Sequence, residues 1–235
     1  MIIYPLPTNI IPFFVLGLSI LLFGIRGIYL YKKQKTPLIL YYGAGAILGG
    51  ISALLYSLPF LFTQNEEYLK LTTIVGDIFY FGSILVMVRL IWYMGLNKKI
   101  SFLWILLPYL AMIFGAFIST LVAFPDIHYS FANDGVHYPV PVIASWFFAA
   151  MSSAYVFVGI LTLKHTRSIS DHKQRMRLLL IGLSFLVGGV FAIYNFLFSQ
   201  GSNSNLISMV GYLIAAIILF IGIFIISRKK ASVNN

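Results

Sequence analysis

Seven long apolar stretches, separated by short polar connections, occupy almost the whole chain. Each is about 20 residues or longer, which is the length that a helix needs to cross a ~30 Å hydrocarbon core at ~1.5 Å per residue. The pattern predicts an all-α integral membrane protein, a bundle of seven transmembrane helices in a single domain, 1–235. The predicted spans are residues 10–31, 38–62, 69–96, 102–124, 140–163, 176–198 and 206–227.

The composition supports this class of protein. The chain is 60% hydrophobic and 9% charged, with a mean hydropathy of +0.94, which leaves too little polar surface to cover a soluble globule. The first nine residues carry no charge, so we expect the first span to be retained rather than removed with a signal peptide. The chain has no cysteine, which excludes disulfides and thiolate chemistry.

Positive charge is concentrated at alternate ends of the predicted spans, for example at Lys32, Lys99 and Lys164, while Glu66 and Glu67 lie at the opposite ends. Because positively charged short loops stay in the cytoplasm, we expect a multi-pass protein of the cell membrane with its N-terminus outside and its C-terminus inside. The basic face would meet anionic lipid head groups. We expect no nucleic-acid partner, since no soluble basic surface is available to follow a phosphate backbone.

A pattern of small residues occurs twice. Gly43, Gly49, Gly50 and Ala53 recur as glycine, glycine, glycine and alanine over residues 182–192, at an offset of 139. This spacing suggests two parallel three-helix repeats, the first to third and the fifth to seventh helices, joined by the fourth as a linker, as in some transporters. Chance alignment of small residues in apolar helices remains the alternative.

Asp77 is the acid that lies deep within an apolar span. A charged carboxylate there costs several kcal/mol unless it is paired, hydrated or protonated, so we expect polar partners near it. Two interpretations stay open: an outward-facing binding pocket, or an interhelical hydrogen bond that only fixes packing. The residues of the candidate pocket are Asp77, Tyr56, Ser145, Tyr194, Asn195 and Tyr212.

The two longest loops carry the other candidate residues. In the outer loop, Asp126, His128, Asp134 and His137 offer oxygen and nitrogen ligands for a divalent cation, but their spacing matches no metal motif, so we predict a solvated loop and no metal. In the inner loop, basic residues would anchor the chain by the positive-inside rule or contact a cytoplasmic protein partner. These residues are Lys164, Arg167, Lys173, Arg175 and Arg177.

Enzyme chemistry and bound cofactors are not expected. The last span has no lysine for a retinal Schiff base, and no span has a histidine in its core, where haem would need its axial ligands. A single buried acid provides no carboxylate pair for acid–base catalysis. We therefore predict a protein that is not an enzyme and carries no cofactor.

The stretch from His172 to Gly182, HKQRMRLLLIG, followed by Asn195 and by a last span with a glycine near its start, resembles the seven-helix sensor region at the front of some bacterial histidine kinases. The resemblance covers the last two spans. It implies an outside N-terminus, an inside C-terminus and transmission of a signal to a cytoplasmic output domain. Because the chain ends shortly after Ser227, we expect no kinase part, so a signal would need a separate partner.

Three functions remain open. The first is a non-enzymatic sensor or receptor-like protein with an outward-facing polar pocket and a basic cytoplasmic face that contacts a partner. The second is an accessory subunit of a larger membrane complex, and the third is a small-solute transporter built on the repeat. A sensor predicts a defined outer cavity, a subunit predicts instability without partners, and a transporter predicts a path that reaches both faces.

Overall fold

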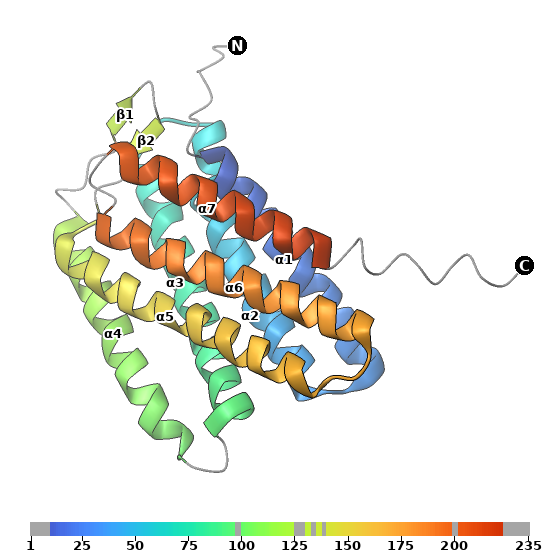
Figure 1. The fold of residues 1–235 in the computed structure, drawn as a ribbon. Coiled ribbons are helices and arrows are strands. Elements are labelled where there is room, and N and C mark those ends of the chain that lie inside the picture. Colours follow the sequence, from blue (N-terminus) through green and yellow to red (C-terminus); the bar gives the residue numbers. More distant parts are fainter. Residues whose placement is uncertain are drawn as a thin grey trace, which may run out of the picture.

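The computed structural model describes residues 10–96, 100–124, 130–132, 135–137, 140–198 and 202–222, and this part of the chain is helical apart from a short hairpin (Figure 1). Strands β1 (Ser130–Ala132) and β2 (Gly135–His137) form that hairpin. The α-helices are α1 (Ile10–Gln34), α2 (Pro37–Leu55), α3 (Glu66–Ile91), α4 (Phe102–Ala123), α5 (Val142–His165), α6 (His172–Phe198) and α7 (Ser202–Phe220).

Among the described residues, six segments that contain α1 to α6 are long and apolar enough to cross a membrane. The apolar part of α7, Ile207–Phe220, is shorter. The prediction of an all-helical, multi-pass membrane protein is thereby confirmed. The seventh crossing and the orientation of the ends remain predictions.

The connection between α2 and α3 differs from the predicted span boundaries. α2 ends at Leu55 rather than near residue 62, because Pro59 has no N–H to donate to the Leu55 carbonyl. The chain then makes a turn and the 3₁₀-helix η1, Pro59–Leu61. α3 begins at Glu66, earlier than predicted, because the Asn65 side chain accepts a hydrogen bond from the Tyr68 N–H at 3.1 Å and caps the helix.

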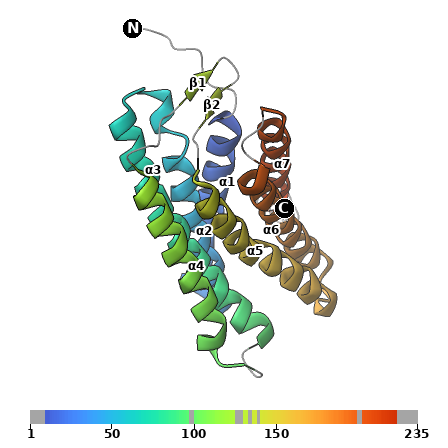
Figure 2. The same ribbon diagram turned by 90° about the vertical axis from the view of Figure 1, so that its left-hand side faces the viewer.

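The helices form a ring in chain order. Each helix packs against the next, α7 closes the ring against α1, and α3 also packs against α5. Figure 2 shows α4 on the outside of the bundle, next to α3 and α5. Of the six helices long enough to cross a membrane, α3 is the most deeply buried. Its Ile84, Met87 and Leu90 side chains are fully buried together with Met151 of α5.

Glycines bring α1 against α2, and α5 against α6, in the same way. A Cβ atom placed on Gly24 of α1 would lie 2.8 Å from the Gly43 carbonyl oxygen and 2.7 Å from the backbone nitrogen of a residue one turn further along α2. A Cβ atom on Gly159 of α5 would lie 2.8 Å from the Gly182 carbonyl oxygen and 2.7 Å from the corresponding backbone nitrogen of α6. Gly43 and Gly182 are the positions that begin the repeated sequence pattern.

A second pair of glycines extends this correspondence. A Cβ atom on Gly50 would lie 2.7 Å from the Leu21 nitrogen, and one on Gly189 would lie 2.8 Å from the Val156 nitrogen. In this correspondence α5 matches α1 and α7 matches α3. The contact between α1 and α7 therefore has its counterpart in the contact between α5 and α3. The first triplet, α1–α3, and the second triplet, α5–α7, therefore pack in corresponding ways around the ring.

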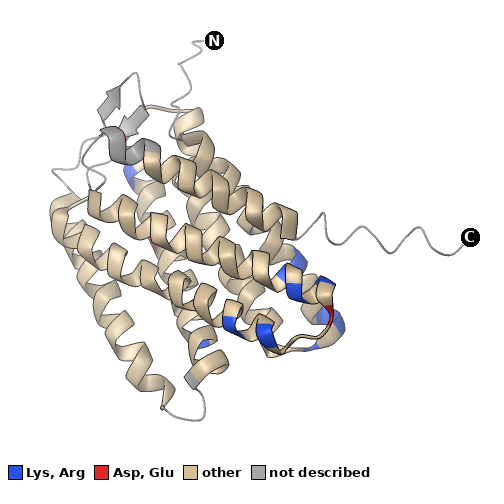
Figure 3. Ribbon diagram, in the orientation of Figure 1, with Lys and Arg blue, Asp and Glu red and all other residues tan. Residues whose placement is uncertain are grey.

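Basic residues gather at one end of the bundle, where α1 ends and α5 is joined to α6 (Figure 3). Lys32 and Lys33 lie in the last turn of α1, and Lys164 lies in the last turn of α5. Glu66 and Glu67, in the first turn of α3, lie at the other end. Lys32 and Lys164, which the sequence pattern assigns to one face, thus lie at the same end of the bundle, whereas Lys99 lies outside the described residues.

Candidate binding site

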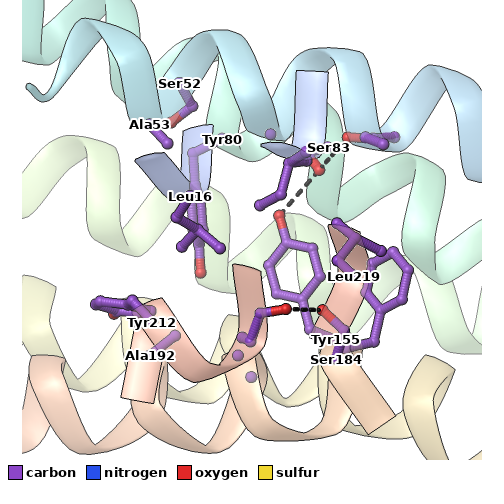
Figure 4. A pocket seen from close by; sticks show the side chains of 18 of the residues that line it. Leu16, Ser52, Ala53, Tyr80, Ser83, Tyr155, Ser184, Ala192, Tyr212 and Leu219 are labelled. Carbon is purple, nitrogen blue, oxygen red and sulfur yellow. Dashed lines mark hydrogen bonds between the residues drawn. The ribbon is translucent and has the colours of Figure 1, made fainter. Parts of the chain in front are cut away.

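A cavity of about 130 Å³ lies between the two triplets, bordered by every helix except α4. Most of its lining is apolar, and among the described residues no charged side chain contributes to it. Figure 4 shows that side chains of several helices point into this space. The hydroxyl-bearing lining residues are Ser52, Tyr56, Tyr80, Ser83, Tyr155, Ser184 and Tyr212.

Small residues at corresponding positions of α2 and α6 leave this space open. Gly49 and Ala53 of α2 line the cavity, and so do Gly188 and Ala192 of α6. These four residues are members of the repeated sequence pattern, so each triplet contributes the same positions to the cavity wall. The cavity is therefore a feature of the interface between the triplets rather than of one helix pair.

Hydrogen bonds hold most of the lining hydroxyls in place. The Tyr155 hydroxyl donates to Ser83 Oγ at 2.9 Å, and Ser83 Oγ donates to the Gly45 carbonyl oxygen at 2.7 Å. These two bonds link α5 to α3 and α3 to α2. Ser184 Oγ donates to the Ala215 carbonyl oxygen at 2.8 Å and links α6 to α7. Both sets are visible in Figure 4.

Tyr80 is held in a similar way, whereas Tyr212 is not. The Tyr80 hydroxyl lies 2.8 Å from Ser152 Oγ, which donates to the Phe148 carbonyl oxygen at 2.9 Å. Tyr212 is 4% exposed, and its ring packs against Phe13 with the ring centroids 4.7 Å apart. Within the described part of the chain, the Tyr212 hydroxyl makes no hydrogen bond, although it borders the cavity.

Asp77 lies behind the cavity wall. The Tyr56 hydroxyl donates a hydrogen bond to Asp77 Oδ1 and joins α2 to α3. Gly76 makes room for the Tyr56 ring, because a Cβ atom there would lie 2.8 Å from Tyr56 Cε1. Asp77 is 6% exposed and lies about 16 Å along α3 from Glu66 at ~1.5 Å per residue. It has the interhelical hydrogen bond that the sequence suggested, and its partner also lines the cavity.

The other residues of the predicted pocket lie elsewhere. The Ser145 hydroxyl is 3.5 Å from the Val140 carbonyl oxygen at the start of α5. The Tyr194 ring packs against Phe198, 5.0 Å between centroids, and Asn195 is partly buried on the same helix. None of Ser145, Tyr194 and Asn195 is among the residues that line the cavity.

Sequence reasoning missed Tyr80, Ser83, Tyr155 and Ser184. The candidate partners of Asp77 came from the outer part of each predicted span, whereas these four residues lie close to the middle of their helices. The usable signal was the presence of hydroxyl groups in the centres of apolar spans, where each needs a hydrogen-bond partner.

The basic residues of the predicted inner loop lie together where α5 ends and α6 begins. Lys164, Arg167, Lys173 and Arg175 are exposed, and Arg177 is partly buried. Contact with lipid head groups or with a protein partner stays a prediction for these residues.

Most of the candidate residues of the predicted outer loop lie in the part of the chain that the structure does not describe. Asp126, His128 and Asp134 lie outside the described residues, and the side chain of His137 in β2 is not described. In the part of the chain that the structure does describe, no three His, Asp or Glu residues come together as a metal site.

Comparisons with protein-family models, with curated proteins and with solved structures found no match for this chain. Its function must therefore be inferred from the cavity and from the surfaces of the bundle.

Proposed function

We propose that this protein is a non-enzymatic, sensor or receptor-like membrane protein that binds a small molecule in the cavity between the two triplets. The observation that carries the proposal is the cavity itself, which is lined by the buried residue Tyr212, whose hydroxyl has no hydrogen bond within the described residues. Protein interiors contain few voids larger than a water molecule. An apolar cavity of about 150 Å³ accepts benzene, so the space of about 130 Å³ suits a small ligand.

The position of the cavity fits a sensor. With the N-terminus outside and the C-terminus inside, as we propose, Phe13 near the start of α1 and Tyr56 at the end of α2 border the outer end of the cavity. The cavity extends from there through the middle of the bundle to Met87 near the end of α3. α5 and α6 line the cavity and also carry the basic residues at their inner ends. Ligand binding would thus alter helices whose cytoplasmic ends face a partner, as the resemblance to kinase sensor regions implies.

Native mass spectrometry of the protein in lipid nanodiscs tests this proposal. The variants are Ala192→Leu, which places three additional carbon atoms at the cavity wall, and Ala111→Leu, which places them on the exposed face of α4. We expect a small molecule to remain bound to the wild type and to Ala111→Leu, and to be lost from Ala192→Leu. Its absence from all three would contradict the proposal, and a protein partner retained in equal amount through a salt wash would favour the accessory subunit.

A small-solute transporter is the second candidate. It is favoured by the corresponding packing of Gly24 with Gly43 and of Gly159 with Gly182, which indicates a parallel repeat around a central cavity. Transporters of this type rock their repeats against each other so that the central site opens to each side in turn. This candidate requires access to the cavity from both faces of the membrane, whereas a sensor requires access from one.

A further inference from the structure

The hydroxyl groups that line the cavity differ in whether they already donate a hydrogen bond to another group of the protein. Tyr155 donates to Ser83, Ser83 donates to a backbone carbonyl, and Ser184 donates to another. Each hydroxyl has one hydrogen atom to donate. The donors of these three side chains are therefore occupied within the bundle.

Tyr56 and Tyr80 are occupied in the same sense. Tyr56 donates to Asp77. Because the Ser152 hydroxyl donates to a carbonyl oxygen, the hydrogen bond between Tyr80 and Ser152 takes its hydrogen atom from Tyr80.

Two lining hydroxyls remain without a hydrogen bond among the described residues, those of Ser52 and Tyr212. The Ser52 Oγ is completely covered by surrounding atoms, so a ligand in the cavity does not reach it. Tyr212 is therefore the lining residue whose hydroxyl is available to donate to a ligand.

The apolar side chains around Tyr212 favour a ligand that is mainly apolar and carries a single polar atom. It belongs to a cluster with Leu16, Ala215 and Ala216, against which Ala192 is packed, and Figure 4 shows it close to Leu16 and Ala192. An unsatisfied buried donor costs roughly as much as a lost hydrogen bond. A ligand that brings an acceptor to this hydroxyl removes that cost.

The rest of the lining excludes charged ligands. In the described part of the chain, no Lys, Arg, His, Asp or Glu side chain lines the cavity, so an ion would enter without a counter-charge in the middle of the membrane, where burial is expensive. Asp77 is separated from the cavity by Tyr56, whose hydroxyl is bonded to it.

We infer that the ligand is a small, uncharged and mainly apolar molecule with one hydrogen-bond acceptor, which receives a hydrogen bond from the Tyr212 hydroxyl. The inference rests on the proposed function, since it names the ligand class of the same cavity. The size of the cavity corresponds to a molecule of about the size of benzene. Tyr212 is the residue that distinguishes a ligand with an acceptor from a hydrocarbon of the same shape.

Two fluorinated probes of equal size test the inference. 3-Fluoropyridine has a ring nitrogen that accepts a hydrogen bond, and fluorobenzene has a C–H group at that place. Saturable binding of each probe is measured by ¹⁹F NMR in nanodiscs with the wild type, Tyr212→Phe, Ala192→Leu and the control Tyr109→Phe, whose hydroxyl lies 3.2 Å from Ser153 rather than at the cavity. Empty nanodiscs correct for partitioning into lipid.

We expect the wild type and Tyr109→Phe to bind 3-fluoropyridine about fivefold more tightly than fluorobenzene, the value of one hydrogen bond. Tyr212→Phe should bind both probes equally, and Ala192→Leu should bind neither. Equal binding of the two probes to the wild type overturns the inferred ligand class while the cavity remains a binding site, and this result does not depend on the folding of any variant. Failure of both probes to saturate the wild type overturns the ligand class and the proposed function together.

Discussion

The close approach of α1 to α2 and of α5 to α6 depends on glycine, so alanine at Gly24 or Gly159 should disrupt each pair to the same extent. In both cases the new Cβ atom would lie 2.7 and 2.8 Å from backbone atoms of the neighbouring helix. Backbone atoms cannot rotate away as a side chain can, so the helices must move apart. Overpacking of this kind costs about 1–3 kcal/mol.

Gly188→Ala is the matched control. Its Cβ atom would lie 3.6 Å from the Ala215 Cβ, an ordinary contact, next to the cavity. The gain in helix propensity from glycine to alanine, up to ~1 kcal/mol, applies at all three positions, so the control measures that contribution by itself. We expect Gly188→Ala to leave the free energy of unfolding unchanged or to raise it.

Unfolding of the purified protein by SDS in mixed micelles, followed by circular dichroism, measures these free energies. Equal losses for Gly24→Ala and Gly159→Ala, with none for Gly188→Ala, would support corresponding packing of the two triplets. A stable Gly159→Ala beside a destabilised Gly24→Ala would refute it. A loss at Gly188→Ala as large as at the other two would show that steric contact at the helix pairs is not the cause.

Two further predictions concern the buried hydrogen bond between α2 and α3. Tyr56→Phe removes the donor to Asp77 and should lower the free energy of unfolding by about 1–3 kcal/mol. In the same SDS titration, Tyr109→Phe should cost less, because its hydroxyl is 3.2 Å from a partly exposed Ser153. Asp77→Asn keeps an oxygen that accepts from Tyr56 and removes an acid from the interior, so the protein should be at least as stable as the wild type. A destabilised Asp77→Asn would show that the carboxyl group has a further role.

The pattern of apolar residues was sufficient to predict the class of fold, because the length and hydropathy of a span are local properties of the sequence. The ends of α2 and α3 were placed less well. The effect of Pro59 on the preceding carbonyl and the cap formed by Asn65 depend on single side chains near the boundary. Both residues are present in the sequence, but a prediction based on the length of apolar segments takes no account of them.

The cavity was less predictable than the bundle. The sequence suggested a partner for Asp77, and the hydrogen bond from Tyr56 was among the alternatives considered. Tyr155 and Ser184 were not considered, because which faces of α5 and α6 meet the other triplet is decided by long-range packing. The repeated glycines came closest to this information, since Gly49 and Gly188 prove to line the same space.

The most direct test of a ligand cavity open to the outside uses cysteine accessibility. The chain has no cysteine, so Ala192→Cys introduces a single thiol at the cavity wall. Asn65→Cys and Ser168→Cys, both at exposed positions at opposite ends of the bundle, act as references for the two sides of the membrane. Each variant is treated with a small, membrane-impermeant methanethiosulfonate in right-side-out and inside-out vesicles.

We expect Asn65→Cys and Ala192→Cys to react from the outside, and Ser168→Cys to react only from the inside. Prior saturation of the cavity with 3-fluoropyridine should slow the reaction at Ala192→Cys alone. Reaction of Ala192→Cys from both sides would favour the transporter. Reaction of Ala192→Cys only from the side of Ser168→Cys, or from neither side, would contradict an outward-facing binding cavity.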